Sequence, residues 1–474
     1  MGKTTGYLEF DRKEPGYRKR GERVRDYQPV EKRLSVDSIK KQAARCMDCG
    51  TPFCFSMGCP LGNIIPEFND MVFRERWEDA LNLLLEKNCF PEFTSAICPA
   101  PCETACILNI NDDAVTIRQI EKEIIEMGFN KGFVQPEPPA ERIDRSVAVV
   151  GSGPAGLTVA QTLNRAGCNV TVFEKEQRVG GLLRYGIPDF KFDKSILDRR
   201  ITLMSAEGVV FESGTSVGND ISLEYLNRRF DAVCLCGGAM RPRDLQVPGR
   251  NLKGVYFAMD FLVQQNKLLL GEDIKGELIT AKDRKVVIIG GGDTGSDCLG
   301  TALRQGAKEV HQFEIMPEPP CKRAESNPWP EWPNIRRTSS SHKEGGVRKW
   351  SVSTVKFTGD DKEHLTGIHC KEVAWEKSHG RMVFEVLEGT EFDVAADMAL
   401  LAMGFTGLND DVLEGMELKR DPHDGIWTDE QRMTSMDGIF SAGDMRIGQS
   451  LVVRAIADGQ AAAKDILLYL QRSK

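Results

Sequence analysis

The 474-residue sequence predicts an α/β protein in which a small helical domain precedes two parallel-sheet domains. Residues 1–145 are rich in charge and cysteine, and a Pro-rich linker at 135–140 (QPEPPA) separates them from strand-like sequence. A strand, a glycine-rich turn and a helix then follow one another at 146–163 and again at 285–303. Because alternating strands and helices build parallel sheets, we expect two Rossmann-like nucleotide-binding domains.

Within the N-terminal block we expect helices at 72–86 and 114–127. The second places apolar residues at the spacing of one helix face, namely Ile117, Ile120, Ile124 and Met127. Proline cannot continue a helix, so the linker marks the end of this domain. We therefore expect a helical domain over 1–145.

The first glycine loop (GSGPAG) follows the apolar strand at 147–150 directly and opens a helix. Gly151 would make the tight turn, Gly153 would let the backbone approach a pyrophosphate, and Gly156 would let helix and strand pack closely. The helix N-terminus would attract the anion. Glu174 ends the next strand at the distance expected for an acid that binds a ribose hydroxyl, so the loop predicts a dinucleotide site.

The C-terminal segment completes this first site. The sequence IFSAGD at 439–444 indicates a last strand that ends at Asp444, and GQSLVVRAIADGQ at 448–460 opens a final helix. Together with the first loop, these elements indicate an FAD domain. Asp444 would bond the ribityl chain of the flavin, and the helix start after Gly448 would lend its positive end to the reduced isoalloxazine.

The second glycine loop, at 290–295 (GGGDTG), follows the strand VVIIG and should hold the pyrophosphate of NAD(P)H by the same physics. The following strand ends at Glu314, where an acid would bond a free 2′-hydroxyl and repel a 2′-phosphate, which favours NADH. Lys322 and Arg323 follow closely and could compensate for NADPH, so the choice between the two stays open. We expect an FAD domain at 146–253 and 396–474, and an NAD(P)H domain at 254–395.

Eight of the fourteen cysteines lie in the first 106 residues. They form one group of four, a second group of three, and the separate Cys89; the two groups are Cys46, Cys49, Cys54, Cys59 and Cys98, Cys102, Cys106. Seven closely spaced thiolates suggest two metal centres. Iron–sulfur clusters are favoured over zinc because they accept single electrons from a flavin, although a zinc-stabilised binding module stays an alternative.

Composition excludes several other functions. The net charge is −8 and no basic stripe recurs, so nucleic-acid binding is not expected. No apolar run is long enough to span a bilayer, and the N-terminus has no signal-peptide segment, so we expect no membrane association and a cytoplasmic location. Cys234 and Cys236 fall in one buried-looking strand, where core packing is expected rather than a redox pair.

Several motifs carry a resemblance over essentially the whole chain. They are CMDCGTPFC, CPAPCETAC, GSGPAGL, GGLLRYGIPDFK, GGGDTG and AGDMRIGQSLVVRAI. The sequence resembles the small (beta) subunits of glutamate synthase, a group shared with the electron-input half of dihydropyrimidine dehydrogenase and the large subunit of a bifurcating transhydrogenase. The insertion at 317–349, with Trp329 and Trp332, resembles a segment of some of these subunits, and we expect both tryptophans to pack the insertion.

The resemblance implies two [4Fe–4S] clusters with interleaved ligands. One cluster would be held by Cys46, Cys49, Cys54 and Cys106, and the other by Cys59, Cys98, Cys102 and, in place of a fourth thiolate, Glu121. A surface role of Glu121 on its helix stays the alternative. With the two loops, the candidate cofactor-binding residues are Gly151, Gly153, Pro154, Ala155, Gly156, Glu174, Lys175, Gly181, Leu182, Gly290, Gly292, Asp293, Thr294, Glu314, Gly443, Asp444, Gln449, Ser450 and Leu451.

The implied function is that of an electron-input subunit. NAD(P)H would be oxidised at FAD, and electrons would pass through the clusters to a large (alpha) subunit that makes glutamate from glutamine and 2-oxoglutarate. The chain would then work in a hetero-oligomer, and no residue need act as a strong acid or base. The alternative is the electron-input subunit of a bifurcating transhydrogenase or of another flavin and iron–sulfur oxidoreductase.

Overall fold

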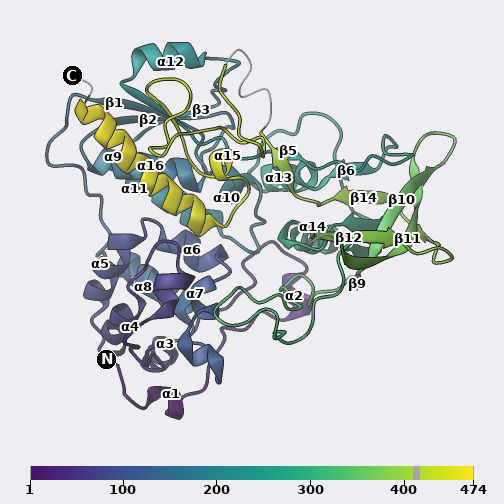
Figure 1. Cartoon of the computed structure of the whole chain (residues 1–474), viewed down its shortest axis with the longest axis horizontal. Coiled ribbons are helices and arrows are strands. Elements are labelled where there is room, and N and C mark those ends of the chain that lie inside the picture. Colours follow the sequence, from purple (N-terminus) through teal and green to yellow (C-terminus); the bar gives the residue numbers. More distant parts are fainter. Residues whose placement is uncertain (1, 379–380, 409–416, 473–474) are drawn as a thin grey trace.

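The computed structural model describes residues 2–378, 381–408 and 417–472. A helical domain formed by the N-terminal part of the chain lies beneath a first sheet domain, and a second sheet domain lies to the side of both (Figure 1). The first sheet domain carries the 151–156 loop and the second carries the 290–295 loop. In the part of the chain described, no helix is long and apolar enough to cross a membrane.

The helical domain packs short helices around an apolar core. Its helices are α1 Gly6–Glu9, α3 Val36–Ala44, the π-helix Cys54–Gly58, α4 Ile65–Phe73, α5 Trp77–Lys87, α6 Pro91–Ile97, α7 Pro101–Thr104, the 3₁₀ helix Ile107–Ile110 and α8 Ile117–Asn130. The short helix α2 Arg20–Arg23 lies apart from these, below the second sheet domain, where Arg23 pairs with Glu344 (Figure 1). The expected single helix at 72–86 is wrong: α4 ends at Phe73, and Glu75 takes a left-handed conformation with φ 62° before α5 begins. A non-glycine residue with positive φ cannot continue an α-helix.

The helix expected at 114–127 is present as α8, which begins three residues later. Ile117, Ile120 and Ile124 are buried on the face that the sequence pattern indicates. Met127 packs at the edge of the same core. This helix carries Glu121 and contacts α5 and α6, so it ties the second cysteine group to the rest of the domain.

The first sheet domain is a five-stranded parallel sheet in the order β16-β4-β1-β2-β3. Its strands are β1 Ser146–Val150, β2 Asn169–Glu174, β3 Val210–Ser213, β4 Ala232–Leu235 and β16 Ile439–Ser441. Its helices are α9 Pro154–Arg165, α10 Gly181–Tyr185, α11 Lys194–Ala206, α12 Leu223–Arg229, α15 Asp444–Ile447 and α16 Val452–Arg472. Helices α9 and α16 pack against each other on the sheet, which brings the C-terminal segment beside the first loop (Figure 1).

The second sheet domain has a parallel sheet in the order β6-β14-β7-β8-β9. Its strands are β6 Val255–Phe257, β7 Lys285–Ile289, β8 Glu309–Phe313, β9 Val347–Lys349 and β14 Met398–Leu401, and its helices are α13 Ala258–Leu269 and α14 Asp293–Arg304. Strand β14 lies in the range expected to return to the FAD domain, yet it pairs with β6 and β7. The chain therefore leaves the second sheet after Leu401.

An antiparallel sheet extends from the second sheet domain, and the sequence analysis contained no expectation for it (Figure 1). It is built from β10 Val352–Gly359, β11 Leu365–Ser378, β12 Arg381–Val386 and β13 Phe392–Ala395. Two short strands, β5 Arg241–Pro242 and β15 Phe405–Gly407, pair with each other and join the two segments that connect the sheet domains.

Candidate functional site

A cavity of about 1230 Å³ lies where the three domains meet. Its wall includes the first loop at Gly151 and Gly153, the start of α14 at Asp293, and the helical domain at Cys98. The sequence-predicted residues that line it are Gly151, Gly153, Pro154, Ala155, Glu174, Lys175, Gly181, Leu182, Asp293, Asp444, Ser450 and Leu451. The predicted residues outside its wall are Gly156, Gly290, Gly292, Thr294, Glu314, Gly443 and Gln449.

The first loop forms a cradle in which Gly151 and Gly153 have different roles. Gly151 has φ 100°, and a Cβ there would lie 2.5 Å from the carbonyl oxygen of Cys236. A Cβ on Gly153 would meet no protein atom within 4 Å, so the space before the N-terminus of α9 is open. An open backbone cradle at a helix N-terminus fits a dinucleotide pyrophosphate.

Glu174 lies buried at the end of β2, beside this cradle. Its carboxylate accepts hydrogen bonds from the backbone N–H of Ser152 at 3.2 Å and of Glu176 at 2.9 Å, and from the hydroxyl of Ser152. These contacts fix the carboxylate at the edge of the cavity, where a ribose would lie if the pyrophosphate occupied the cradle.

The C-terminal segment reaches the same cavity. Asp444 begins α15, accepts a hydrogen bond from the Ser450 hydroxyl at 2.8 Å, and burial raises its pKa to about 6. Leu451 immediately precedes α16, so the N-terminus of this 21-residue helix points toward the cavity wall. Gln449 instead accepts a hydrogen bond from the Phe405 backbone N–H at 3.3 Å.

The second loop repeats the geometry of the first. A Cβ on Gly292 would meet no protein atom within 4 Å, which leaves the N-terminus of α14 open. Glu314 follows β8 and accepts hydrogen bonds from the backbone N–H of Gly291 at 2.6 Å and of Met316 at 2.9 Å. The guanidinium of Arg323 donates to three carbonyl oxygens of its own insertion, those of Asn327, Pro328 and Glu331.

An ion pair that the sequence analysis missed crosses the cavity between the two sheet domains. Lys191, in the loop before α11, pairs with Asp297 on α14, and both side chains line the cavity. Nearby, the backbone N–H of Val30 donates to the carbonyl oxygen of Phe190 at 2.9 Å, so the N-terminal segment joins the same wall. The sequence signal was the GGLLRYGIPDFK motif, which contributed to the resemblance without assigning Lys191 a role.

The first thiol set, defined as Cys46, Cys49, Cys54 and Cys106, surrounds a second and much smaller cavity. Burial, together with the charges of Cys106 and Cys49, raises the pKa of Cys46 to about 11. The same two effects raise the pKa of Cys54. Thiols held this close, in a site that resists their ionisation, need a positive centre to become thiolates.

The second thiol set, defined as Cys59, Cys98 and Cys102 together with Glu121, gathers nearby. Burial raises the pKa of Cys59 to about 11 and of Cys98 to about 12, and the charge of Glu121 raises both. Glu121 is only 6% exposed, accepts a hydrogen bond from Asn63 Nδ2 at 2.8 Å, and has a pKa that burial raises to about 7. It is therefore not a surface carboxylate.

The two sets differ in their relation to the large cavity. Cys98 and the adjoining Pro99 line it, whereas no residue of the first thiol set does. Among the described residues, no three His, Cys, Asp or Glu side chains are arranged to hold one metal ion. The fit to clusters rests instead on donor chemistry: four thiols in one set, and three thiols with a buried carboxylate in the other.

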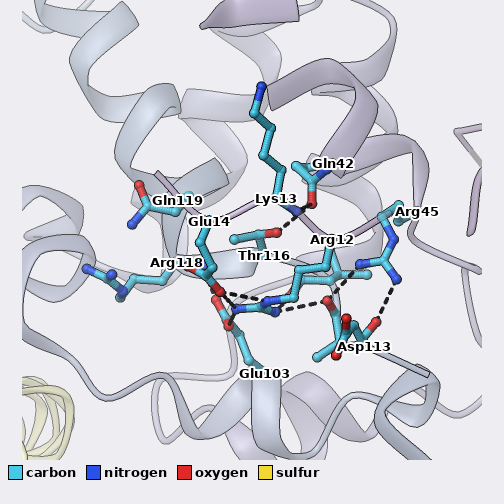
Figure 2. Close-up of polar contacts among 12 residues, drawn as sticks. Arg12, Lys13, Glu14, Gln42, Arg45, Glu103, Asp113, Thr116, Arg118 and Gln119 are labelled. Atoms are coloured by element: carbon cyan, nitrogen blue, oxygen red, sulfur yellow. Dashed lines mark hydrogen bonds and ion pairs between the residues drawn. The ribbon is translucent and has the colours of Figure 1, made fainter. Parts of the chain in front are cut away.

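A buried polar network fixes the segment that connects the two sets (Figure 2). Arg12 pairs with Glu103 at 2.6 Å and donates to the carbonyl oxygen of Ala114 at 2.9 Å. Arg45 donates to the same carbonyl at 3.0 Å and to that of Asp113 at 2.8 Å. In the sequence, Glu103 lies between Cys102 of the second set and Cys106 of the first set, so the network holds the segment that carries both cysteines. The sequence composition did not indicate this network.

The insertion at 317–349 covers one side of the first thiol set. Trp329 Nε1 donates to the carbonyl oxygen of Cys106 at 3.3 Å, and its ring centroid lies 4.9 Å from that of Phe53. Trp332 is 41% exposed and stacks with the guanidinium of Arg337. Trp329 thus contacts the helical domain. Elsewhere, Cys234 and Cys236 are buried with sulfur atoms 3.7 Å apart.

Comparison with known proteins agrees with this architecture. Residues 145–459 match the pyridine nucleotide-disulphide oxidoreductase family, and residues 23–133 match dihydropyrimidine dehydrogenase domain II, 4Fe-4S cluster. Among solved structures, Mycobacterium tuberculosis FprA in complex with NADPH has a TM-score of 0.56 at 18% identity, over 71% of this chain and 86% of that one. The match to the 4Fe-4S family decides between iron–sulfur and zinc in favour of iron–sulfur.

Relatives of known name match over the full length. The glutamate synthase [NADPH] small chain of Mycobacterium tuberculosis is 51% identical over 100% of this chain and 97% of its own length. The protein of the same name from Bacillus subtilis is 44% identical over 100% and 99%. The glutamate synthase [NADH] of Saccharomyces cerevisiae is 44% identical over 99% of this chain, which corresponds to 22% of that longer protein.

Proposed function

The chain belongs to the family of glutamate synthase small chains, and from this membership we propose that it delivers electrons from a reduced nicotinamide nucleotide to a large subunit that makes glutamate. It is an NAD(P)H-dependent oxidoreductase whose cofactors are FAD and [4Fe–4S] clusters. The large subunit is proposed because the relatives are named small chains and because the fungal relative is a single, longer glutamate synthase.

One structural observation carries this proposal. The large cavity extends from the first glycine loop to the start of α14 and to Cys98, so one space adjoins both nucleotide-binding loops and a thiol of the second set. When bound, FAD accepts a two-electron hydride and gives electrons singly to iron–sulfur centres. The protein itself would position the reacting groups, because catalysis of this kind depends on how these groups are held.

Different residues would hold the FAD, the nicotinamide nucleotide and the two clusters. Gly153 and the N-terminus of α9 would hold the FAD pyrophosphate, Glu174 a ribose, and Asp444 with the N-terminus of α16 the flavin end. Gly292 and the N-terminus of α14 would hold the nicotinamide nucleotide. The first thiol set would hold one cluster and the second thiol set the other, with Glu121 as its fourth ligand.

The geometry favours NADH over NADPH. Glu314 presents a fixed carboxylate at the end of β8, where a 2′-phosphate would be repelled. Of the two cations that could compensate, Arg323 donates through one guanidinium nitrogen to three carbonyl oxygens of the insertion, and Lys322 is exposed. The relatives carry both coenzymes in their names, so this choice rests on the site itself.

A cytoplasmic location is also proposed. The chain has fourteen cysteines, of which seven are proposed cluster ligands, and such use of cysteine is typical of proteins in a reducing compartment.

The decisive experiment reconstitutes the reaction. The purified chain is reduced anaerobically with NADH or NADPH while flavin absorbance is followed, and glutamate is then assayed from glutamine and 2-oxoglutarate with and without a candidate large subunit. We expect the flavin to bleach whether or not the large subunit is present, and glutamate to form only when it is present. Bleaching without glutamate in the complex, together with reduction of a ferredoxin, would favour the transhydrogenase alternative.

A further inference from the structure

A buried asparagine faces the first thiol set without a hydrogen-bond partner. Asn69 lies on α4, is 0% exposed, and lines the small cavity together with the four thiols of that set. Neither its Nδ2 nor its Oδ1 atom has a hydrogen-bond partner among the residues that the structure describes. Buried side-chain amides are nearly always paired in native proteins, so an unpaired one beside a cofactor site points to the cofactor as its partner.

The position of Asn69 agrees with this reading. Apart from Asn69 itself, the only polar side chains among the described residues that line the small cavity are the four thiols of the first set, and its other lining residues are apolar. The second thiol set offers a contrast: the buried Asn63 directs its Nδ2 to the Glu121 carboxylate at 2.8 Å. The two buried amides therefore lie at different sets, Asn63 bonded to a carboxylate and Asn69 beside thiols alone.

We propose that Asn69 donates an N–H···S hydrogen bond to the cluster held by the first thiol set and thereby raises the reduction potential of that cluster. The proposal rests on the function proposed above. Reduction adds negative charge to a cluster, and a donor aimed at its sulfurs stabilises that charge. Asn69 is a positioning residue in this account, because it acts through the cluster and touches no substrate.

A raised reduction potential in the first thiol set agrees with the order in which electrons would reach the two sets. Cys98 of the second thiol set lines the large cavity, so electrons would reach that set first. Asn69 brings a neutral donor to the first set, which raises the reduction potential of that set. A higher potential in the first set favours electron flow from the large cavity outward.

The test is a potentiometric titration of the full chain, followed by electron paramagnetic resonance, in the wild type and in Asn69→Leu. Leucine has a similar volume and no donor. We expect the one-electron equilibrium of one cluster to shift about tenfold toward its oxidised form, which is about 59 mV for one electron. The other cluster serves as the internal control and should keep its potential.

A second variant covers the case in which leucine prevents cluster assembly. Asn69→Ser keeps a donor on a shorter side chain and should shift the potential of the same cluster in the same direction as Asn69→Leu, but by less. If leucine gives no cluster, an unshifted potential in Asn69→Ser would by itself overturn the proposal. Unchanged potentials in both variants, or equal shifts of both clusters, would overturn the proposal. A wild-type chain without any cluster signal would instead overturn the proposed function.

Discussion

Lys191 and Asp297 form an ion pair that joins the first sheet domain to the second across the wall of the large cavity. The pair is mostly buried, and the charge of Asp297 raises the pKa of Lys191 against the effect of burial. It links the loop after α10 to the helix whose N-terminus would receive the nicotinamide nucleotide. The relative position of the two proposed nucleotide sites therefore depends in part on these two side chains.

Removing one partner of this pair should destabilise the chain. Lys191→Met leaves the Asp297 carboxylate buried without its cation, and we expect the free energy of unfolding to fall by about 3 kcal/mol. The double variant Lys191→Met/Asp297→Leu removes both charges and should recover most of that loss. Chemical denaturation of the two variants measures the difference, and equal stability of the single variant and the wild type would contradict the pairing.

Matched substitutions can distinguish the functions of the two glycine loops. A Cβ on Gly153 or on Gly292 meets no protein atom, so neither Gly153→Ala nor Gly292→Ala should change the thermal unfolding midpoint of the cofactor-free chain. Gly153→Ala should lose bound FAD because its methyl group occupies the pyrophosphate cradle. Gly292→Ala should keep FAD, yet its flavin should be reduced by NADH at least tenfold more slowly. Loss of FAD in Gly292→Ala would show that the loops are assigned in the wrong order.

Glu314 is expected to set the coenzyme preference. Glu314→Ser removes the acceptor for a 2′-hydroxyl and the charge that repels a 2′-phosphate, so kcat/KM should fall about tenfold for NADH and rise for NADPH. The exposed Lys322 provides the control: Lys322→Ser should leave the ratio of the two coenzymes unchanged. A selective loss of NADPH use in Lys322→Ser would mean that this lysine binds the phosphate.

Glu121 is expected to be a cluster ligand. Glu121→Ala should remove one of the two clusters and halve the iron content of the anaerobically prepared chain. Glu123, on the same helix and equally buried, pairs with Arg33 at 2.8 Å and makes a matched control. Glu123→Gln should retain all the iron. Iron analysis that gives the same value for both variants and the wild type would exclude Glu121 as a ligand.

The sequence was sufficient for features that depend on local spacing. Strand, glycine turn and helix recur around Gly151 and Gly290 because the backbone geometry of such a loop allows few other residues. The break between α4 and α5 was not predictable, since Glu75 gives no local sign of its positive φ. The pairing of β14 with β7, and the ion pair of Lys191 with Asp297, depend on contacts between distant segments that no periodicity encodes.

If the second thiol set carries electrons out of the large cavity, Cys98→Ala should interrupt electron transfer to the large subunit. The measurement compares NADH-dependent dye reduction with glutamate formation in the complex with the large subunit. Cys89, which lies outside both sets and accepts a hydrogen bond from Gln460, supplies the control variant Cys89→Ala. We expect Cys98→Ala to retain dye reduction and to lose glutamate formation, and Cys89→Ala to retain both. Glutamate formation at the wild-type rate in Cys98→Ala would contradict this role of the second thiol set.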